Sequence, residues 1–230
     1  MATSGTATFN LDLTEVVEEA FERCGAELRT GYDLRTARRS LNLLFADWAN
    51  RGVNLWTVEQ GSTILVAGTA TYNLPDDTVD LLEQVIRTGA GVASTQADLN
   101  ITRISVSTYA TIPNKLTQAR PIQVYINRQS PTPTITVWPV PDTSATYTFV
   151  YWRLRRIQDA GSGVNTMDVP FRFIPCMVAG LSYYLSMKVP GALERMQTLK
   201  MQYDEAWDLA SSEDRDKAAV RFVPRQQFIS

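Results

Sequence analysis

The sequence of 230 residues contains no histidine. Histidine is the side chain that most often moves protons near neutral pH and the commonest metal ligand. Its absence excludes serine-histidine-aspartate triads and histidine-based metal sites. A hydrolase with paired carboxylates stays possible, because glycosidases work in that way. We expect a protein that is not an enzyme and has no catalytic, cofactor-binding or metal-binding residues.

Cysteine is scarce, and the two cysteines, Cys24 and Cys176, lie far apart in the chain. Both fall on the apolar faces of expected helices. Free cysteine behaves as a small hydrophobic residue, so we expect buried, reduced thiols. The alternatives are a disulfide and a nucleophile.

Long apolar runs are also missing. No stretch approaches the about 18 apolar residues that cross a bilayer, and the opening MATSGTATFN lacks the charged-then-apolar layout of a signal peptide. We therefore expect a protein that is made and used in a cytosol, with no membrane partner. The net charge of −2 provides no general positive field of the kind that grips nucleic acid.

Two helices are expected before residue 54. The first has Leu13, Val16, Val17, Ala20, Phe21 and Cys24 on one face and glutamates on the other, with Gly25 as its stop. The second has Asp33 as a possible N-cap and ends at Asn50-Arg51-Gly52. Its apolar face carries Leu34, Ala37, Leu41, Leu44 and Trp48, whereas Arg35, Arg38, Arg39 and Asp47 can face water.

Two more helices are expected near the end. Asp168-Val169-Pro170 marks a start, followed by an apolar stripe of Phe171, Ile174, Val178, Leu181 and Leu185, and Pro190-Gly191 breaks this helix. The last helix is predicted from about Ala192 to Lys217, with a stripe of Leu193, Met196, Lys200, Tyr203, Trp207 and Ala210.

The middle of the chain is rich in Thr, Val, Ile and Tyr and is cut by Gly and Pro, which is typical of an all-β region. Thr88 to Asn100 is predicted to be a long exposed loop, and Asp80 to Arg87 could instead be a short helix. The predicted strands are Leu55 to Gln60, Ser62 to Val66, Asp80 to Arg87, Ile101 to Ile104, Ile122 to Asn127, Thr134 to Trp138 and Thr146 to Arg155.

These elements predict the α+β class. The N- and C-terminal helix pairs, 1–53 and 161–217, would form a four-helix bundle because each helix has one apolar face to bury. The inserted region, 54–160, would form an antiparallel β-sandwich or barrel-like domain. The residues 218–230 would form an extended C-terminal arm.

Few residues suggest chemistry. Asp76 and Asp77 follow Pro75 in a turn-like stretch, where aspartate is favoured by its backbone hydrogen bonds; a metal or acid-base role is the alternative. Arg153, Arg155 and Arg156 end a strand and are expected to form surface ion pairs, with phosphate or an acidic partner as the alternative.

Aromatic residues concentrate late in the β region. Tyr147, Phe149 and Tyr151 alternate along a strand and should share one face, for which core packing is the expected use. The alternative is a sugar-stacking platform, which requires exposed aromatic rings among Trp138, Tyr151 and Trp152.

A family resemblance is carried by the proline-rich stretch Ala119 to Asp142, ARPIQVYINRQSPTPTITVWPVPD. It predicts a hairpin, and it is followed by a strand ending in YWR and by a DVP that opens a helix. This order of elements, over roughly Leu11 to Ala210, resembles the head-to-tail adaptor proteins of short-tailed bacteriophages, of the tail tubular protein A type.

The resemblance implies a virion structural protein of the tail or neck, present in the host cytoplasm during assembly. Copies would form a homo-oligomeric ring, dodecameric in that family, which docks under the portal protein, connects it to the tail nozzle protein, and lets double-stranded DNA pass without sequence-specific binding. The C-terminal arm would bind the portal, or else be a frayed terminus; its candidate residues are Arg221, Phe222, Val223, Arg225 and Phe228. The alternative function is a carbohydrate- or receptor-binding β module of a phage tail.

Overall fold

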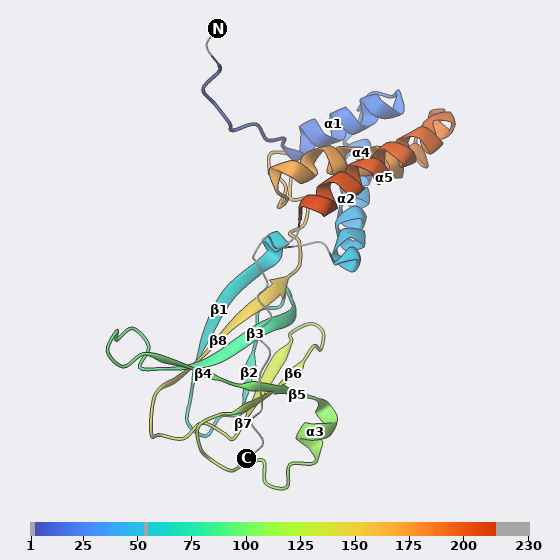
Figure 1. Cartoon of the computed structure of the whole chain (residues 1–230). Helices are drawn as coiled ribbons and strands as arrows, with labels where there is room; N and C mark the ends of the chain where they lie inside the picture. The colour runs from blue at the N-terminus through green and yellow to red at the C-terminus, as the bar shows by residue number, and fades with distance from the viewer. Residues whose placement is uncertain (1–2, 53–54, 215–230) are drawn as a thin grey trace, which may run out of the picture. The chain divides into compact units, whose positions relative to one another are not determined.

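A computed structural model describes residues 3–52 and 55–214 of the chain. This part contains five α-helices, three short 3-10 helices and eight strands, so the protein belongs to the α+β class (Figure 1). The chain divides into two compact units. The helical unit comprises Met1–Leu55 and Gln158–Ser230, and the β unit comprises Trp56–Ile157.

The first helix, α1 (Leu13–Cys24), has the predicted bounds. Asp12 caps it: its side chain accepts a hydrogen bond from the backbone N–H of Glu15, and the Glu15 carboxylate accepts one from the N–H of Asp12. Gly25 ends the helix with a positive φ of 77°, which a residue without Cβ adopts at little cost. The local sequence alone therefore sets both ends of α1.

The second helix, α2 (Gly31–Arg51), starts earlier than predicted. Thr30 is the N-cap, and Asp33, which was predicted to be the cap, lies at the third helical position. The Thr30 hydroxyl accepts from the N–H of Asp33, and the Asp33 carboxylate accepts from the N–H of Thr30. The pair forms a capping box, in which the hydroxyl residue is the N-cap and the acidic residue stands three positions later.

The predicted C-terminal helices are present as α4 (Ile174–Ser186) and α5 (Met196–Glu213). The buried residues of α5 are Leu199, Tyr203, Trp207 and Ala210. The start of the predicted stripe was wrong, because Leu193 and Lys200 are exposed and Leu199 is buried instead. A 3-10 helix, Ala192–Arg195, precedes α5; its three residues per turn shift the phase of the pattern. The predicted end at Lys217 lies outside the described residues.

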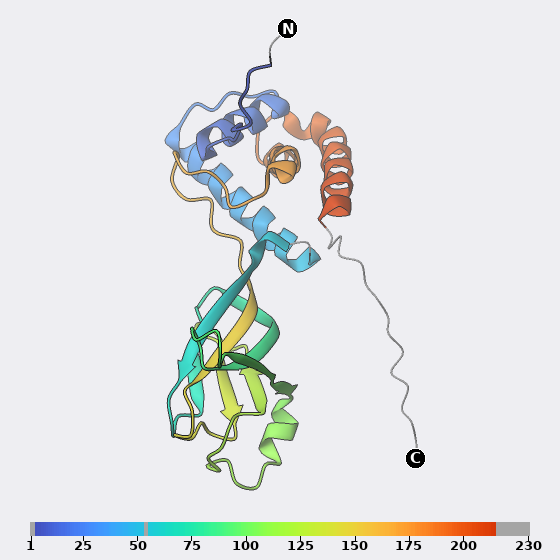
Figure 2. The ribbon, with the colours of Figure 1, turned by 60° about the vertical axis from the view of Figure 1, so that its left-hand side comes forward.

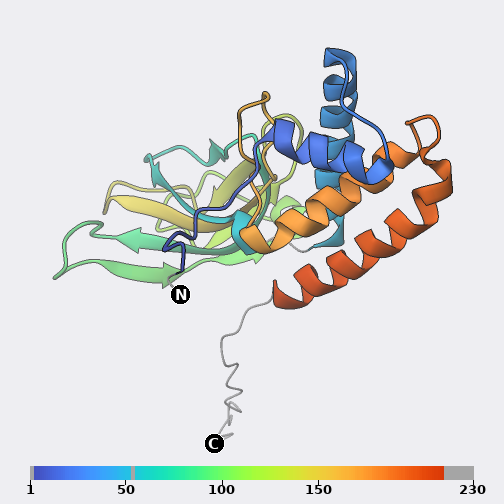
Figure 3. The ribbon, with the colours of Figure 1, turned by 90° about the horizontal axis from the view of Figure 1, so that it is seen from above.

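Helix α4 is the centre of the helical unit. It contacts α1, α2 and α5, and Figure 2 looks nearly along it with the other three helices around it. In Figure 3, α1, α4 and α5 lie side by side while α2 crosses them. Gly180 allows close packing of α4 against α2 and α5, since a Cβ there would lie 2.9 Å from side-chain atoms of Leu44 and Tyr203.

An aromatic cluster fills the space between α2, α5 and the residues before α4. Trp48 is fully buried, and its ring centroid lies 5.5 Å from that of Phe173 and 5.5 Å from that of Trp207. Its indole N–H donates a hydrogen bond of 3.0 Å to the hydroxyl of Tyr203. The predicted core role of Trp48 is confirmed, whereas the four-helix bundle as a packing class stays a prediction.

The β unit contains two four-stranded sheets, with the strand orders β1-β8-β3-β4 and β2-β7-β6-β5. In the described residues the sheets are separate, so the barrel-like closure was wrong. The strands are β1 (Val58–Leu65), β2 (Thr71–Asn73), β3 (Thr78–Thr88), β4 (Ala97–Asn100), β5 (Thr102–Ile104), β6 (Gln123–Asn127), β7 (Thr134–Trp138) and β8 (Tyr147–Arg155).

Both sheets contribute to one apolar core, although a sandwich as such stays a prediction. Phe149 of β8, Ile86 of β3 and Ile135 of β7 are fully buried members of it. The other buried members are Leu65, Leu74, Leu81, Ile101, Val124, Ile126, Val137, Tyr147 and Tyr151. The alternation predicted for Tyr147, Phe149 and Tyr151 is confirmed as core packing.

Two predictions for the first sheet were wrong in detail. The two strands predicted before and after Gly61 form the single strand β1, which follows a 3-10 helix, Leu55–Thr57. Gly61 continues the strand because the Tyr151 ring covers it, at 2.5 Å from the position that a Cβ would take. The predicted loop Thr88 to Asn100 contains β4, which pairs with β3. The strand predicted at Asp80 to Arg87 is confirmed as part of β3, so the alternative of a short helix was wrong.

The second sheet differs from the all-antiparallel expectation. Strand β5 pairs with β6 in parallel, while β6 pairs with β7 as the predicted hairpin. The chain between β5 and β6 includes a short helix, α3 (Val106–Ala110), which was not predicted. A parallel pair needs such a crossover, because a tight turn can only join antiparallel strands.

Candidate functional site

The residues predicted to bind the portal lie outside the described residues. They are Arg221, Phe222, Val223, Arg225 and Phe228. Their role stays a prediction. A candidate site in the described residues must therefore consist of other charged and polar side chains.

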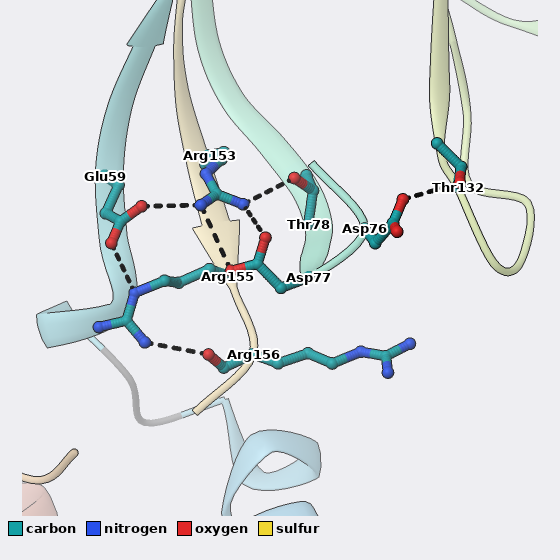
Figure 4. A network of polar contacts seen from close by, with 8 residues as sticks. All are labelled: Glu59, Asp76, Asp77, Thr78, Thr132, Arg153, Arg155 and Arg156. Carbon is teal, nitrogen blue, oxygen red and sulfur yellow. Dashed lines mark hydrogen bonds and ion pairs between the residues drawn. The ribbon is translucent and has the colours of Figure 1, made fainter. Parts of the chain in front are cut away.

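The arginines at the end of β8 belong to a network of ion pairs (Figure 4). Arg153 donates to Glu59 of β1 at 2.8 Å, to the hydroxyl of Thr78 at 2.9 Å, and to Asp77. Arg155 donates to the other oxygen of Glu59 at 2.7 Å. The expected ion pairs are therefore confirmed for these two arginines, which join β8 to β1 and to the start of β3. Their expected place on the surface was wrong, because both guanidinium side chains are largely buried.

The network lowers the pKa of Asp77, chiefly through the hydrogen bond from Arg153. A carboxylate stabilised in this way stays charged and is a poor proton donor. Arg156 does not join these pairs, and Figure 4 shows its side chain extending away from them. The arrangement ties strands together and offers no open cradle for phosphate.

Asp76 and Asp77 lie in a turn before β3, as predicted, but the hydrogen bonds of their side chains come from the side chains of distant residues. Asp76 accepts a hydrogen bond of 2.7 Å from the hydroxyl of Thr132. Within residues 3–52 and 55–214, no group of three or more His, Cys, Asp or Glu side chains is placed to hold a metal ion. In the same residues no helix is long and apolar enough to span a membrane.

The two cysteines are buried free thiols, as expected. Burial raises the pKa of Cys24 to about 11 and that of Cys176 to about 12. The Cys24 thiol donates to the carbonyl oxygen of Ser182 at 3.2 Å. A thiol with a raised pKa holds little thiolate at neutral pH, so neither group suits nucleophilic chemistry.

The aromatic platform that a sugar-binding module would need is not formed around Tyr151, which is buried. Trp138 is half-buried, and its indole N–H donates to the carbonyl oxygen of Asn114 at 3.0 Å. Trp152 is also half-buried. Tyr151 therefore cannot stack on a sugar, and its ring serves the core of the β unit.

The surface of the helical unit offers a different kind of site, in which charge is not neutralised internally. Arg35, Arg38 and Arg39 are exposed on α2, and none of the three has a carboxylate partner among the described residues. Together with Tyr32 they line a shallow hollow. The sequence predicted that these arginines face water, and it did not show that they lack ion-pair partners.

An acidic surface lies on α5 of the same unit. Asp204, Glu205 and Asp208 line a hollow together with Met201 and Leu209, and all five side chains are exposed. Sequence reasoning missed this surface because it followed only the apolar stripe through Tyr203 and Trp207. The signal was the repeat of residues 201, 205 and 209 on the opposite side of the helix.

Comparison with known proteins bears on the whole chain. Residues 11–225 match the SU10 adaptor protein family, so the match covers both units and reaches beyond the described residues. No curated protein matches the sequence. The family match confirms the resemblance to phage head-to-tail adaptors, and such a protein is a component of the virion neck. The chain belongs to the SU10 adaptor protein family, a family of phage structural adaptor proteins and not of enzymes.

Proposed function

We propose that the protein is the subunit of a ring that docks under the phage portal, connects it to the tail nozzle and forms part of the conduit for DNA ejection. The observation that carries this proposal is the family match over residues 11–225. The unneutralised charges of the helical unit support it, because exposed charge keeps a subunit soluble and can guide it to a partner.

The two units would divide the work. In this proposal α1, α2, α4 and α5 act as one four-helix bundle, from residues 1–53 and 161–217, and face the portal. The β unit, built as a sandwich from residues 54–160, faces the nozzle. The ion pairs across β1, β3 and β8 suit a rigid connector, since they add side-chain links to strands that are already joined by backbone hydrogen bonds and apolar packing.

The lumen would pass double-stranded DNA without gripping it. A protein that binds DNA firmly neutralises many phosphates with clustered Lys and Arg. This chain has 22 basic and 24 acidic residues, so its overall charge gives weak attraction at most. Weak attraction is what a conduit requires. The subunits would assemble in the host cytoplasm.

The residues 218–230 would bind the portal as an arm. This stretch is basic and carries Phe222 and Phe228, a combination that suits binding in an apolar groove with an acidic rim. Deleting Val220 to Ser230 should leave the fold of both units unchanged and strongly weaken portal docking. Equal docking by the truncated and full chains would contradict the role of the arm without touching the family assignment.

The direct test is native mass spectrometry of the full chain mixed with an intact portal ring from the same virus. The expected result is one assembly in which the two proteins are present in a fixed ratio of copies. An intact portal ring that stays bare at micromolar concentrations of the full chain would overturn the docking proposal.

A further inference from the structure

The outward face of α2 combines positive charge with exposed apolar groups. Arg35 and Arg39 lie on the side of the helix opposite its buried stripe, with Tyr32 before them and Leu43 after them. Tyr32 is 62% exposed and Leu43 is 59% exposed. We call these four residues the basic face. Its two arginines have no ion-pair partner in the described residues, so their positive charges are not neutralised by a neighbouring carboxylate.

The outward face of α5 has the same layout with the opposite charge. Glu205 and Asp208 lie between Met201 and Leu209, each of which is 66% exposed. We call these four residues, with the neighbouring Asp204, the acidic face. No close ion pair forms at Glu205 or Asp208 in the described residues, and Asp204 has a longer-range electrostatic interaction with Arg51.

The two faces are opposite in charge, and the basic face is longer than the acidic face by about three residues. With a rise of about 1.5 Å per residue, the apolar ends are about 16 Å apart on the basic face and about 12 Å apart on the acidic face. Each face therefore places about two or three charged groups between two apolar groups. Large exposed apolar side chains around charged ones are typical of a surface that a partner covers.

We propose that the basic face of one copy of this chain docks on the acidic face of a second copy. This inference rests on the proposed ring and identifies the surfaces that would join its subunits. The two faces are different surfaces of the same unit, so the contact is heterologous: every copy donates one face and receives the other. Such contacts generate rings when the rotation between subunits closes.

A second copy fits the observations better than nucleic acid does. DNA would approach the basic face but would be repelled by the acidic face, leaving Met201 and Leu209 uncovered. A second copy covers both faces in each subunit and pairs the arginines with the carboxylates. The paired charges would also set the register of the contact, because a displaced register would bring like charges together.

The test uses reciprocal charge reversal in the full chain. One variant carries Arg35→Glu and Arg39→Glu, and a second carries Glu205→Arg and Asp208→Arg; the new residues are all good helix formers. Each variant alone should associate with itself at least about tenfold more weakly than the original chain, since like charges then face each other. An equimolar mixture of the two should recover association, because each reversed face meets a reversed partner.

Association is measured by sedimentation velocity and native mass spectrometry, with and without the portal ring. Two matched controls reverse exposed charges of the β unit, Arg120→Glu and Glu83→Arg, and should associate like the original chain. Circular dichroism confirms that each variant is folded, and a variant that does not fold is replaced by Arg35→Gln with Arg39→Gln or Glu205→Gln with Asp208→Gln.

The outcomes separate this inference from the proposed function. If each variant alone loses self-association and the mixture recovers it, the proposed contact between the two faces is supported, whether or not the portal is bound. If each charge-reversed variant by itself binds the portal ring in as many copies as the original chain does, the inference is overturned and the docking proposal stands. If the chain self-associates in a way that depends on these charges but does not bind the portal ring, the docking proposal is overturned and the inference stands. An original chain that neither associates nor docks would overturn both.

Discussion

The two units of this protein use charge in different ways. In the β unit the ion pairs join separate strands or sheets: Arg87 to Asp98, Arg103 and Arg128 to Asp80, and Arg153 and Arg155 to Glu59. In the described part of the helical unit, the pairs Glu19 to Arg23, Glu27 to Arg29 and Asp47 to Arg51 join near neighbours. Arg172 and Asp214 join separate elements there.

The difference shows what holds each unit together. Exposed pairs between neighbouring residues of one helix contribute only a few tenths of a kcal/mol, so the helical unit depends on apolar packing and helix caps. Asp80 of β3 binds arginines that lie in or beside the second sheet, so in the β unit a charge links the two sheets. The helical unit thereby keeps its charges available for partners.

The strongest test of this comparison removes the aromatic centre of the helical unit. Trp48→Ala should lower the free energy of unfolding of that unit by about 3–5 kcal/mol, because it empties a fully buried site and leaves the Tyr203 hydroxyl without its donor. Hydrogen exchange measured by mass spectrometry resolves the two units. Trp48→Phe, which keeps a ring, should cost less. Equal loss of protection in both units would show that they do not unfold separately.

The corresponding test for the β unit removes Arg153. Arg153→Met keeps most of the apolar stem but leaves Asp77 and Glu59 without its donors, and should cost about 1–3 kcal/mol. The value should fall near the lower end, because the two carboxylates are partly exposed to solvent. Chemical denaturation followed by circular dichroism gives the change. The variant Arg156→Met is the control, and an equal effect there would contradict the network's role.

A helix cap gives a smaller effect in the helical unit. Thr30→Ala removes the hydroxyl that accepts from the N–H of Asp33 and should destabilise the unit by about 1 kcal/mol. Thr30→Ser keeps an acceptor oxygen and should stay close to the original chain. The measurement is the denaturation midpoint of each variant, and identical midpoints for alanine and serine would show that the cap contributes nothing.

Acid should lower the stability of the β unit by protonating its aspartates. The contribution of each aspartate is the smallest of the effects predicted here. Hydrogen bonds from Arg153 and Arg87 lower the pKa values of Asp77 and Asp98. A carboxyl group whose pKa is lower in the folded state stabilises fully above its unfolded pKa of about 3.9, and this stabilisation is lost as the pH falls through the folded pKa. Denaturation midpoints between about pH 7 and pH 3 should therefore depend less on pH in the Asp77→Asn, Asp98→Asn double variant.

Several elements could be read from the sequence because their signals are local. Gly25 was predicted to end α1 and does so, and the turn chemistry around Pro131 and Pro133 placed the hairpin of β6 and β7 correctly. The family resemblance rested on the same proline-rich stretch, and the family match confirmed it. Such signals need only a few consecutive residues.

Other elements depended on contacts between distant parts of the chain. Strand β4 lies in a stretch that is small and polar, and it becomes a strand only because β3 offers it backbone hydrogen bonds. Gly61 was predicted to end a strand, yet the Tyr151 ring, 90 positions later, makes glycine the residue that fits there. Intrinsic strand preference is weak compared with this tertiary context.

The sequence by itself determined the four long helices, the glycine stop of α1, the buried thiols and the absence of histidine chemistry, because these follow from composition and from periodicity within one segment. The tertiary structure alone decided the strand orders, the parallel pairing of β5 with β6, and which charges are neutralised. An arginine in a sequence carries the same charge whether or not a carboxylate lies beside it. Only the fold shows that Arg153 meets Asp77 while Arg35 and Arg39 stay without ionic partners in the described residues.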